Sequence, residues 1–228
     1  MVETGGVQEM SAVAVYLMDK PFPLTRGVSP AEDDAELIAR CREGDATAFR
    51  EIYRRHRSSI FRIVARMLSN SADQEEVTQE VLLQVFRSLS SFKGTAKLST
   101  WIHRVTMNVV LQHIRYKKSR IRLHFEENVI DRSANLAGSV STTPEDSAIQ
   151  KERRSAVERA IGTLSEKKRA ALVLHDFEGL PAKEISQIVG APVLTVRTRI
   201  FYARREFYKR LSGEPAFADI PLDEEAKK

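Results

Sequence analysis

Apolar residues in this chain recur at intervals of three and four, the spacing that gives an α-helix one buried face. In one predicted helix this spacing is carried by eight residues: Phe49, Ile52, Tyr53, His56, Ile60, Ile63, Val64 and Met67. No run of strand-like sequence lies between the predicted helices. The chain is therefore expected to be all-α, with a core built from helix faces.

The helices fall into two groups, separated by a polar and acidic segment. With 228 residues, 42% apolar and 29% charged, the chain is unlike a disordered or collagen-like protein. We predict a disordered arm (1–28), a helical domain (29–120), a flexible acidic linker (121–149), a second helical domain (150–212) and a disordered tail (213–228). The fold class is thus two small helical domains, which such a linker leaves free to reorient.

Capping signals give the helix boundaries. Ser29 with Glu32, and Ser71 with Gln74, each have the spacing of a capping box at a helix start. The helix that starts at Ser71 has the predicted buried stripe Val77, Val81, Val85, Phe86 and Leu89. Further helices are predicted at about 101–118, 145–162, 166–177, 182–189 and 193–211.

Composition limits the partners and the compartment. The chain has a formal net charge of +5, which permits a polyanionic partner without requiring one. Its one cysteine, Cys41, can form neither an intramolecular disulfide nor a multi-thiolate zinc site, which indicates a reducing cytoplasm. The apolar run Ala12 to Met18 is too short to span a bilayer. We expect a cytoplasmic protein with no membrane insertion.

The most specific pattern is a helix-turn-helix in the second domain. A short helix (182–189) and a longer one from Val193 flank Gly190, which supplies the turn. One face of the second helix is apolar, and the other carries Arg197, Thr198, Phe201, Tyr202 and Arg205. Arginine can bind guanine bidentately in the major groove, and an aromatic ring can pack on a thymine methyl. This pattern favours DNA binding over an ordinary solvated helix.

A second basic cluster closes the first domain, with no acidic residue from Arg104 to Arg122. Trp101, Tyr116, Asn108 and Gln112 add groups that could stack on unpaired bases or bond to them. A single tryptophan at a helix start is more often a core anchor, and this alternative stays open for Trp101. The preceding loop, Phe92 to Lys97, is basic and contains Gly94, so it could close over an unpaired strand.

The predicted helix from Ser71 has the opposite charge. Glu76, Gln79, Glu80 and Leu83 fall on one face of it, away from the valine stripe. A solvated helix face would explain these residues. On a chain that is otherwise basic, an acidic face is better suited to a basic protein surface than to DNA.

No catalytic or metal-binding arrangement is found. The five histidines lie far apart without H-x-x-x-H or H-E-x-x-H spacing. The chain has no phosphate-binding G-x-x-x-x-G-K-[ST] loop and no G-x-S-x-G motif. We therefore expect no enzyme activity, no metal and no cofactor.

Taken in order, the two halves resemble a bacterial RNA polymerase sigma factor of the extracytoplasmic-function group, which has sigma regions 2 and 4. The resemblance covers about residues 32–118 and 150–212. It is carried by the segments from Ala72 to Leu82, from Phe92 to Asn108 and from Thr195 to Arg205.

The resemblance implies a division of roles. The acidic helix would bind the clamp helices of core RNA polymerase, the loop and following helix would bind the single-stranded minus 10 element, and the recognition helix would read the duplex minus 35 element. The implied polymerase-binding residues are Asp73, Glu76, Gln79 and Glu80. The implied DNA-binding residues are Lys93, Lys97, Trp101, Arg104, Asn108, Gln112, Arg115, Thr195, Arg197, Thr198, Arg199, Phe201, Tyr202 and Arg205.

Two further expectations accompany this interpretation. Members of the group are commonly held by an anti-sigma factor, which is therefore a possible partner. The competing hypothesis is a dimeric helix-turn-helix transcriptional regulator, which explains residues 150–212 equally well. It does not explain the basic and aromatic segment from Lys93 to Arg122 or the acidic face at Glu76.

Overall fold

The secondary structure of the described residues is helical, as the sequence predicts. The computed structural model describes residues 34–124, 144–218 and 220. The first half forms α2 (Asp34–Arg42), α3 (Ala46–Met67), α4 (Ser71–Ser88), the 3₁₀ turn η1 (Leu89–Ser91) and α5 (Leu98–His124). The second half forms α6 (Pro144–Thr163), α7 (Glu166–Leu172), the π-helical turn η2 (Val173–Phe177), α8 (Ala182–Val189), α9 (Val193–Leu211) and the 3₁₀ turn η3 (Pro215–Phe217). None of the described helices is long and apolar enough to cross a membrane.

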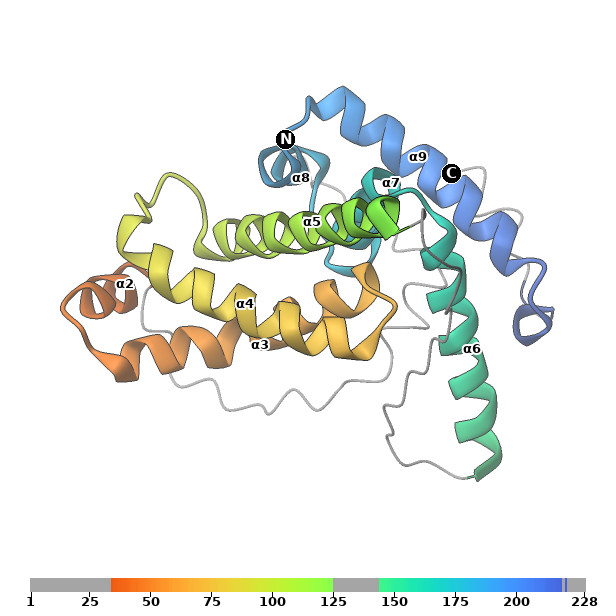
Figure 1. Cartoon of the computed structure of the whole chain (residues 1–228), viewed down its shortest axis with the longest axis horizontal. Coiled ribbons are helices and arrows are strands. Elements are labelled where there is room, and N and C mark those ends of the chain that lie inside the picture. Colours follow the sequence, from red (N-terminus) through yellow and green to blue (C-terminus); the bar gives the residue numbers. More distant parts are fainter. Residues whose placement is uncertain (1–33, 125–143, 219, 221–228) are drawn as a thin grey trace, which may run out of the picture.

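In the first half, α3, α4 and α5 pack side by side and α2 lies at one end of them (Figure 1). Asp45 starts α3 as its N-cap, accepting a hydrogen bond from the backbone N of Thr47 at 2.7 Å. Hydrogen bonds from Thr47 and Arg40 lower the pKa of Asp45, so the cap keeps its charge in more acidic solution than a free aspartate would. Most of the predicted apolar stripe of α3 is buried in the core, with Ile52 and Ile63 at 1% and 0% exposure. Phe49 is partly buried, and Tyr53 is 37% exposed, so the stripe was predicted too wide.

The start of α4 differs from the predicted capping box. Asn70 is the N-cap, and its side chain accepts a hydrogen bond from the backbone N of Asp73 at 3.2 Å. Gln74 instead is buried and donates to the carbonyl of Leu68 at 2.8 Å. Asparagine is as good a cap as serine, so Asn70 can serve in place of Ser71. The helix-capping residue was therefore predicted one position too late.

One member of the predicted stripe of α4 is not buried. Val77, Val81 and Val85 lie in the core, whereas Phe86 is 60% exposed. Its ring makes an edge-to-face contact with Phe49 at 4.8 Å between centroids. Because Phe86 directly follows Val85, a rotation of about 100° about the helix axis carries it off the buried face.

The second half contains the predicted helix-turn-helix. α8 ends at Gly190, whose φ of 61° places it in the left-handed region that favours glycine, and α9 then begins at Val193. Ile185 of α8 and Val196 of α9 are buried in the shared core. The predicted helix at 166–177 is α7 continued by η2, where the hydrogen bonding changes to a π-turn.

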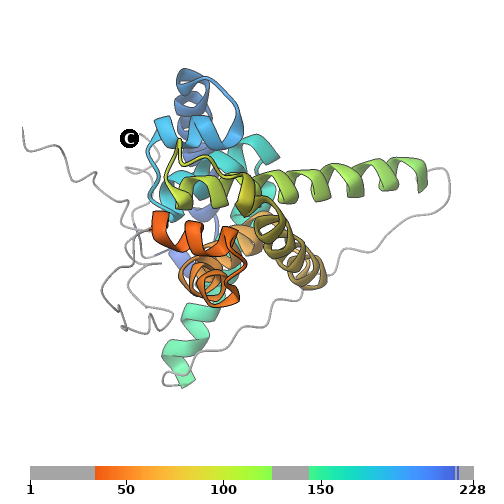
Figure 2. The same cartoon turned by 90° about the vertical axis from the view of Figure 1, so that its left-hand side faces the viewer.

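The two halves pack against each other, which differs from the expectation that they reorient freely. α8 packs on α5, and α3 contacts α6, α7 and η2 (Figure 1). Arg169 of α7 donates a hydrogen bond to the carbonyl of Met67, the last residue of α3, at 2.9 Å. The C-terminal part of α5 extends away from this packed region (Figure 2).

The linker and tail differ from their predicted extents. α5 continues to His124 and α6 begins at Pro144, so both ends of the predicted linker are helical. Past α9, η3 packs on α6, where Phe217 is 1% exposed and Arg153 donates to the carbonyl of Ala216. The first residues of the predicted disordered tail are therefore folded. The arm at 1–28, the capping box at 29–32, and linker residues 125–143 lie outside the described residues.

Candidate nucleic-acid and polymerase interfaces

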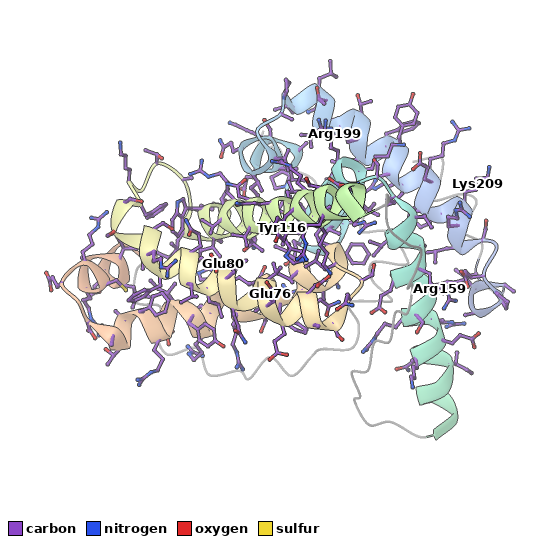
Figure 3. The ribbon with its side chains drawn as sticks, viewed as in Figure 1. Glu76, Glu80, Tyr116, Arg159, Arg199 and Lys209 are labelled. Atoms are coloured by element: carbon purple, nitrogen blue, oxygen red, sulfur yellow. The ribbon has the colours of Figure 1, made fainter. Side chains whose placement is uncertain are left out.

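The recognition helix α9 has two chemically distinct faces, as predicted. Val196, Ile200, Ala203 and Phe207 are buried on the inner face. The predicted DNA-binding residues on the outer face are exposed: Arg197, Thr198, Phe201, Tyr202 and Arg205. Two others, Thr195 and Arg199, are half-buried. The side chain of Arg199 projects from the N-terminal half of α9 (Figure 3). This arrangement presents guanidinium, hydroxyl and aromatic groups together, as base readout in the major groove requires.

A buried ion pair fixes α9 on the preceding turn η2. Arg204 donates to both carboxylate oxygens of Asp176, at 2.6 and 2.9 Å, and His175 Nδ1 lies 2.6 Å from the same carboxylate. Burial alone would raise the pKa of Asp176, but hydrogen bonds from His175 and Arg204 outweigh it and lower the pKa. The charged carboxylate thus ties the recognition helix to η2 at Arg204, which lies beside Arg197 and Phe201 along the helix.

A second polar face runs along α5. Arg104, Asn108, Gln112 and Arg115 are all exposed, and their spacing of three or four residues places them on one side of the helix. Lys93 and Lys97 are exposed in the loop before α5, where Gly94 has a φ of 71°. The structure thus brings six of the predicted strand-binding residues onto one loop and one helix face.

Trp101 does not belong to this exposed face. It is 8% exposed, and its ring packs on that of Phe92 at 5.3 Å between centroids. The prediction that Trp101 stacks on a base is therefore replaced by the alternative of a core anchor. Tyr116 is the exposed ring on α5, at 59% exposure (Figure 3), with the Arg120 guanidinium 5.7 Å from its centroid.

The acidic face of α4 is exposed at three of its four predicted residues. Glu76 and Glu80 project from α4 (Figure 3), and Gln79 is exposed beside them. Leu83, 48% exposed, extends the same face with an apolar group. Asp73, however, is only 15% exposed at its side chain and binds Lys117 of α5. Asp73 therefore ties two helices of the bundle together.

One exposed residue of α9 was missed by the sequence reasoning. Leu194, the second residue of α9, is 75% exposed. Its carbonyl accepts a hydrogen bond from the Thr198 hydroxyl at 3.0 Å, so that hydroxyl is partly engaged by the helix itself. An apolar residue at a helix start gives no signal that separates exposure from burial, so the sequence could not have identified Leu194.

Comparison with known families matches both halves. Residues 52–120 match the family model for sigma-70 region 2, and residues 154–207 match that for sigma-70 region 4. The chain is 30% identical over 185 residues to the RNA polymerase sigma-H factor of Pseudomonas aeruginosa, spanning 79% of this chain and 94% of that protein. The chain belongs to the sigma-70 family. Like the family's other members, this sigma factor binds core RNA polymerase and promoter DNA.

Other relatives point to the extracytoplasmic-function (ECF) group. The sigma factor is 32% identical to the ECF RNA polymerase sigma factor SigW of Bacillus subtilis, over 76% of this chain and 94% of that one. It is 31% identical to the ECF RNA polymerase sigma-E factor of Escherichia coli, over 75% and 90%. The match at residues 52–120 covers the segment that the dimeric-regulator hypothesis leaves unexplained.

Solved structures share the fold. The sigma factor RpoE in complex with the anti-sigma factor NepR from Bartonella quintana matches with a TM-score of 0.58, at 17% identity, over 73% of this chain and 98% of that one. CnrH in complex with the cytosolic domain of CnrY matches with a TM-score of 0.58, at 19% identity, over 80% and 99%. At these identities the likeness supports the helical architecture.

Proposed function

We propose that the sigma factor divides its work among three surfaces. The acidic face of α4 binds a basic surface of core polymerase, the exposed face of α5 with its preceding loop holds the opened strand of the minus 10 element, and the outer face of α9 reads the minus 35 duplex. The observation that carries this proposal is that the three faces lie on different helices and differ in chemistry. One chain can therefore hold polymerase and two stretches of DNA at once.

Strand opening depends on the face of α5. Asn108 and Gln112 can bond to base edges that are accessible only in an unpaired strand, and Tyr116 offers a ring on which a base can stack. A stacked base contributes on the order of 1–3 kcal/mol, which offsets part of the cost of unpairing. Arg104 and Arg115 neutralise the strand's phosphates.

Promoter choice depends on α9 in this proposal. Arg197 lies near the N-terminal end of the helix, the part of a recognition helix that reaches base edges most directly. Phe201 and Tyr202, 47% and 48% exposed, offer apolar surface for thymine methyl groups. The same helix is held on η2 by the ion pair between Arg204 and Asp176, so its outer face is presented in one orientation.

The proposal extends to compartment and partners. The sigma factor works in the cytoplasm with the polymerase, which performs the chemistry of RNA synthesis, so the chain itself needs no catalytic group. An anti-sigma factor is a further expected partner. This expectation is supported by the fold likeness to a sigma factor solved in complex with one.

Permanganate footprinting of promoter thymines tests the strand-binding role. Arg104→Ala and Asn108→Ala in holoenzyme should reduce the reactivity of thymines in the minus 10 element, while duplex binding at the minus 35 element is kept. Arg57→Ala, an exposed arginine of α3, is the matched control and should leave reactivity unchanged. Opening by the Arg104 and Asn108 variants at the level of the control would contradict the role of α5.

A further inference from the structure

A cluster of hydrogen-bond donors on the first half is covered by the second half. Arg62 of α3 donates its Nε and one Nη to the two oxygens of Glu178, at 3.0 and 2.8 Å. Ser59 of α3 donates to the same carboxylate at 2.9 Å, and Arg66 Nη1 lies 3.5 Å from it. Glu178 follows η2 in the second half, and its side chain is only 3% exposed. The cluster is thus an anion site in which the anion comes from the chain itself.

A second carboxylate covers the start of α5 in the same way. Thr100 donates to Glu184 of α8 at 3.0 Å, and Lys97 Nζ lies 3.5 Å from the other oxygen of Glu184. Lys97 is one of the residues proposed above to bind the opened strand. The helix-turn-helix half therefore places a negative charge on part of the strand-binding surface.

The Glu178 site has a hydrogen-bond donor that its occupant does not satisfy, although the charge of Glu158 also acts on Arg66. Two guanidinium groups, Arg62 and Arg66, converge on one carboxylate. Among the described residues, none accepts a hydrogen bond from the buried Nη1 of Arg66. The Arg66 guanidinium also lies over the ring of Phe177, 4.5 Å from its centroid, which limits where it can turn. The site is therefore built to take an anion with additional acceptor oxygens.

Phosphate meets that requirement with the same donors. Guanidinium forks and hydroxyl groups bind phosphate oxygens much as they bind carboxylates, and they do so with charge-assisted hydrogen bonds. A nucleic-acid strand offers such groups in series, with one phosphate for every nucleotide. The two carboxylates bind donors that belong to one surface of the first half, so a continuous strand could replace them one phosphate at a time.

We propose that Ser59, Arg62, Arg66 and Thr100 form a phosphate-binding site for the opened promoter strand, and that Glu178 and Glu184 occupy it while the two halves are packed together. The inference rests on the strand-binding function proposed for the first half. It adds four residues to that surface, three of them on α3. It also makes strand binding and packing of the halves mutually exclusive, because carboxylate and phosphate compete for the same donors.

Binding of labelled single-stranded oligo(dT) to the full chain, without polymerase, tests the competition. The double variant Glu178→Gln and Glu184→Gln should bind roughly tenfold more tightly than wild type, since two charge-assisted contacts that oppose binding are weakened. The control Glu206→Gln with Glu214→Gln makes the same change of net charge. Its carboxylates pair with Lys168 and Arg159 inside the second half, so its affinity should stay within about twofold of wild type.

A third variant locates the gain in affinity. Adding Arg62→Ala to the Glu178 and Glu184 double variant should remove most of the gain, and should lower the dependence of log K on log salt by about 0.7, the loss of one phosphate contact. Circular dichroism and thermal unfolding confirm that each variant is folded. Equal affinity of the Glu178 and Glu184 double variant and its control would overturn the proposal, and so would a gain that survives the loss of Arg62.

The assay separates this inference from the proposed function. Specific initiation by wild-type holoenzyme tests the function, and oligonucleotide binding by the chain without polymerase tests the covered site. Normal initiation with no effect of Glu178 and Glu184 on strand binding would overturn only the covered site. A chain that supports no initiation, but whose Glu178 and Glu184 double variant binds the strand more tightly, would overturn only the function.

Discussion

Lys117 of α5 binds both carboxylate oxygens of Asp73 on α4, one of them at 2.6 Å, across 44 residues of sequence. The pair joins the helix with the acidic face to the helix with the basic one. His113 Nε2 lies 3.7 Å from the same carboxylate. Asp73 is thus engaged within the bundle, and the exposed carboxylates that remain on α4 are Glu75, Glu76 and Glu80, of which the last two belong to the predicted acidic face.

The first prediction concerns that acidic face. Glu76→Lys with Glu80→Lys should weaken binding to core polymerase and leave thermal stability unchanged, because both side chains are exposed and lie off the valine stripe. Exposed ion pairs contribute only about 0–1 kcal/mol each, so both charges must be reversed to give a clear effect. Affinity is measured by titrating labelled sigma factor with core polymerase.

The matched control is Glu43→Lys with Glu152→Lys, which reverses two exposed charges elsewhere on the chain. It should bind polymerase as wild type does. Equal binding by both double variants would remove the polymerase-binding role from α4.

The second prediction concerns promoter reading by α9. Arg197→Ala should cost about 1–3 kcal/mol at the cognate minus 35 element, and should relax preference at one base pair, if the guanidinium binds guanine bidentately. Arg210→Ala, at the exposed C-terminal end of α9, should not change base preference. Footprints on systematically mutated minus 35 elements are the measurement, and a loss of affinity equal on every sequence would make Arg197 a phosphate contact.

The third prediction separates Trp101 from Asn108. Trp101→Ala should lower the free energy of unfolding by about 3–5 kcal/mol, since it removes a buried ring that packs on Phe92. Asn108→Ala should leave stability unchanged and reduce strand opening, because its side chain is exposed. Thermal or denaturant unfolding of both variants measures these changes in the free energy of unfolding. A Trp101→Ala protein of wild-type stability would contradict the burial of this ring.

The fourth prediction concerns pH. Burial lowers the pKa of His103 below 6.5, as does the charge of Arg62, while Glu178 and Glu184 oppose this in part. The unfolded chain then binds more protons than the folded one, so stability is lost as pH falls below about 6.5 through the folded pKa. His103→Gln should reduce the drop in melting temperature between about pH 7.5 and pH 5.5. His56, whose pKa burial also lowers, should contribute to the drop in the same direction. An identical drop in wild type and variant would contradict this account.

Local patterns predicted most of the helices and the faces of α9. The bounds 182–189 and 193–211 match α8 and α9. Gly190 and Pro192 interrupt the periodicity between the two helices, so no long-range contact is needed to end α8 or to begin α9. The same holds for the exposed face that Arg104, Asn108 and Gln112 form on α5. In these segments, the spacing of apolar residues alone decides which side faces solvent.

The sequence could not predict features that depend on distant partners. Arg62 and Glu178 are hydrogen-bonded although 116 residues separate them in the sequence, and Thr100 and Glu184 are hydrogen-bonded across 84 residues. No local spacing of residues can predict either contact. Trp101 and Phe86 were misassigned for a related reason. A large aromatic side chain at the edge of an apolar stripe is buried or exposed according to what packs beside it, and Phe92 covers Trp101 while no comparable cover lies over most of Phe86 among the described residues.

Transcription from a library of random promoter sequences tests the account most directly, because the recognised elements emerge from the selected sequences themselves. Core polymerase with the purified sigma factor should start transcripts at a defined position and enrich two sequence elements at a fixed spacing. The upstream element should lose its preference at one position with Arg197→Ala, and the yield should fall with Glu76→Lys and Glu80→Lys. Transcripts without a defined start, or the same yield and sequences as core polymerase alone, would contradict the account.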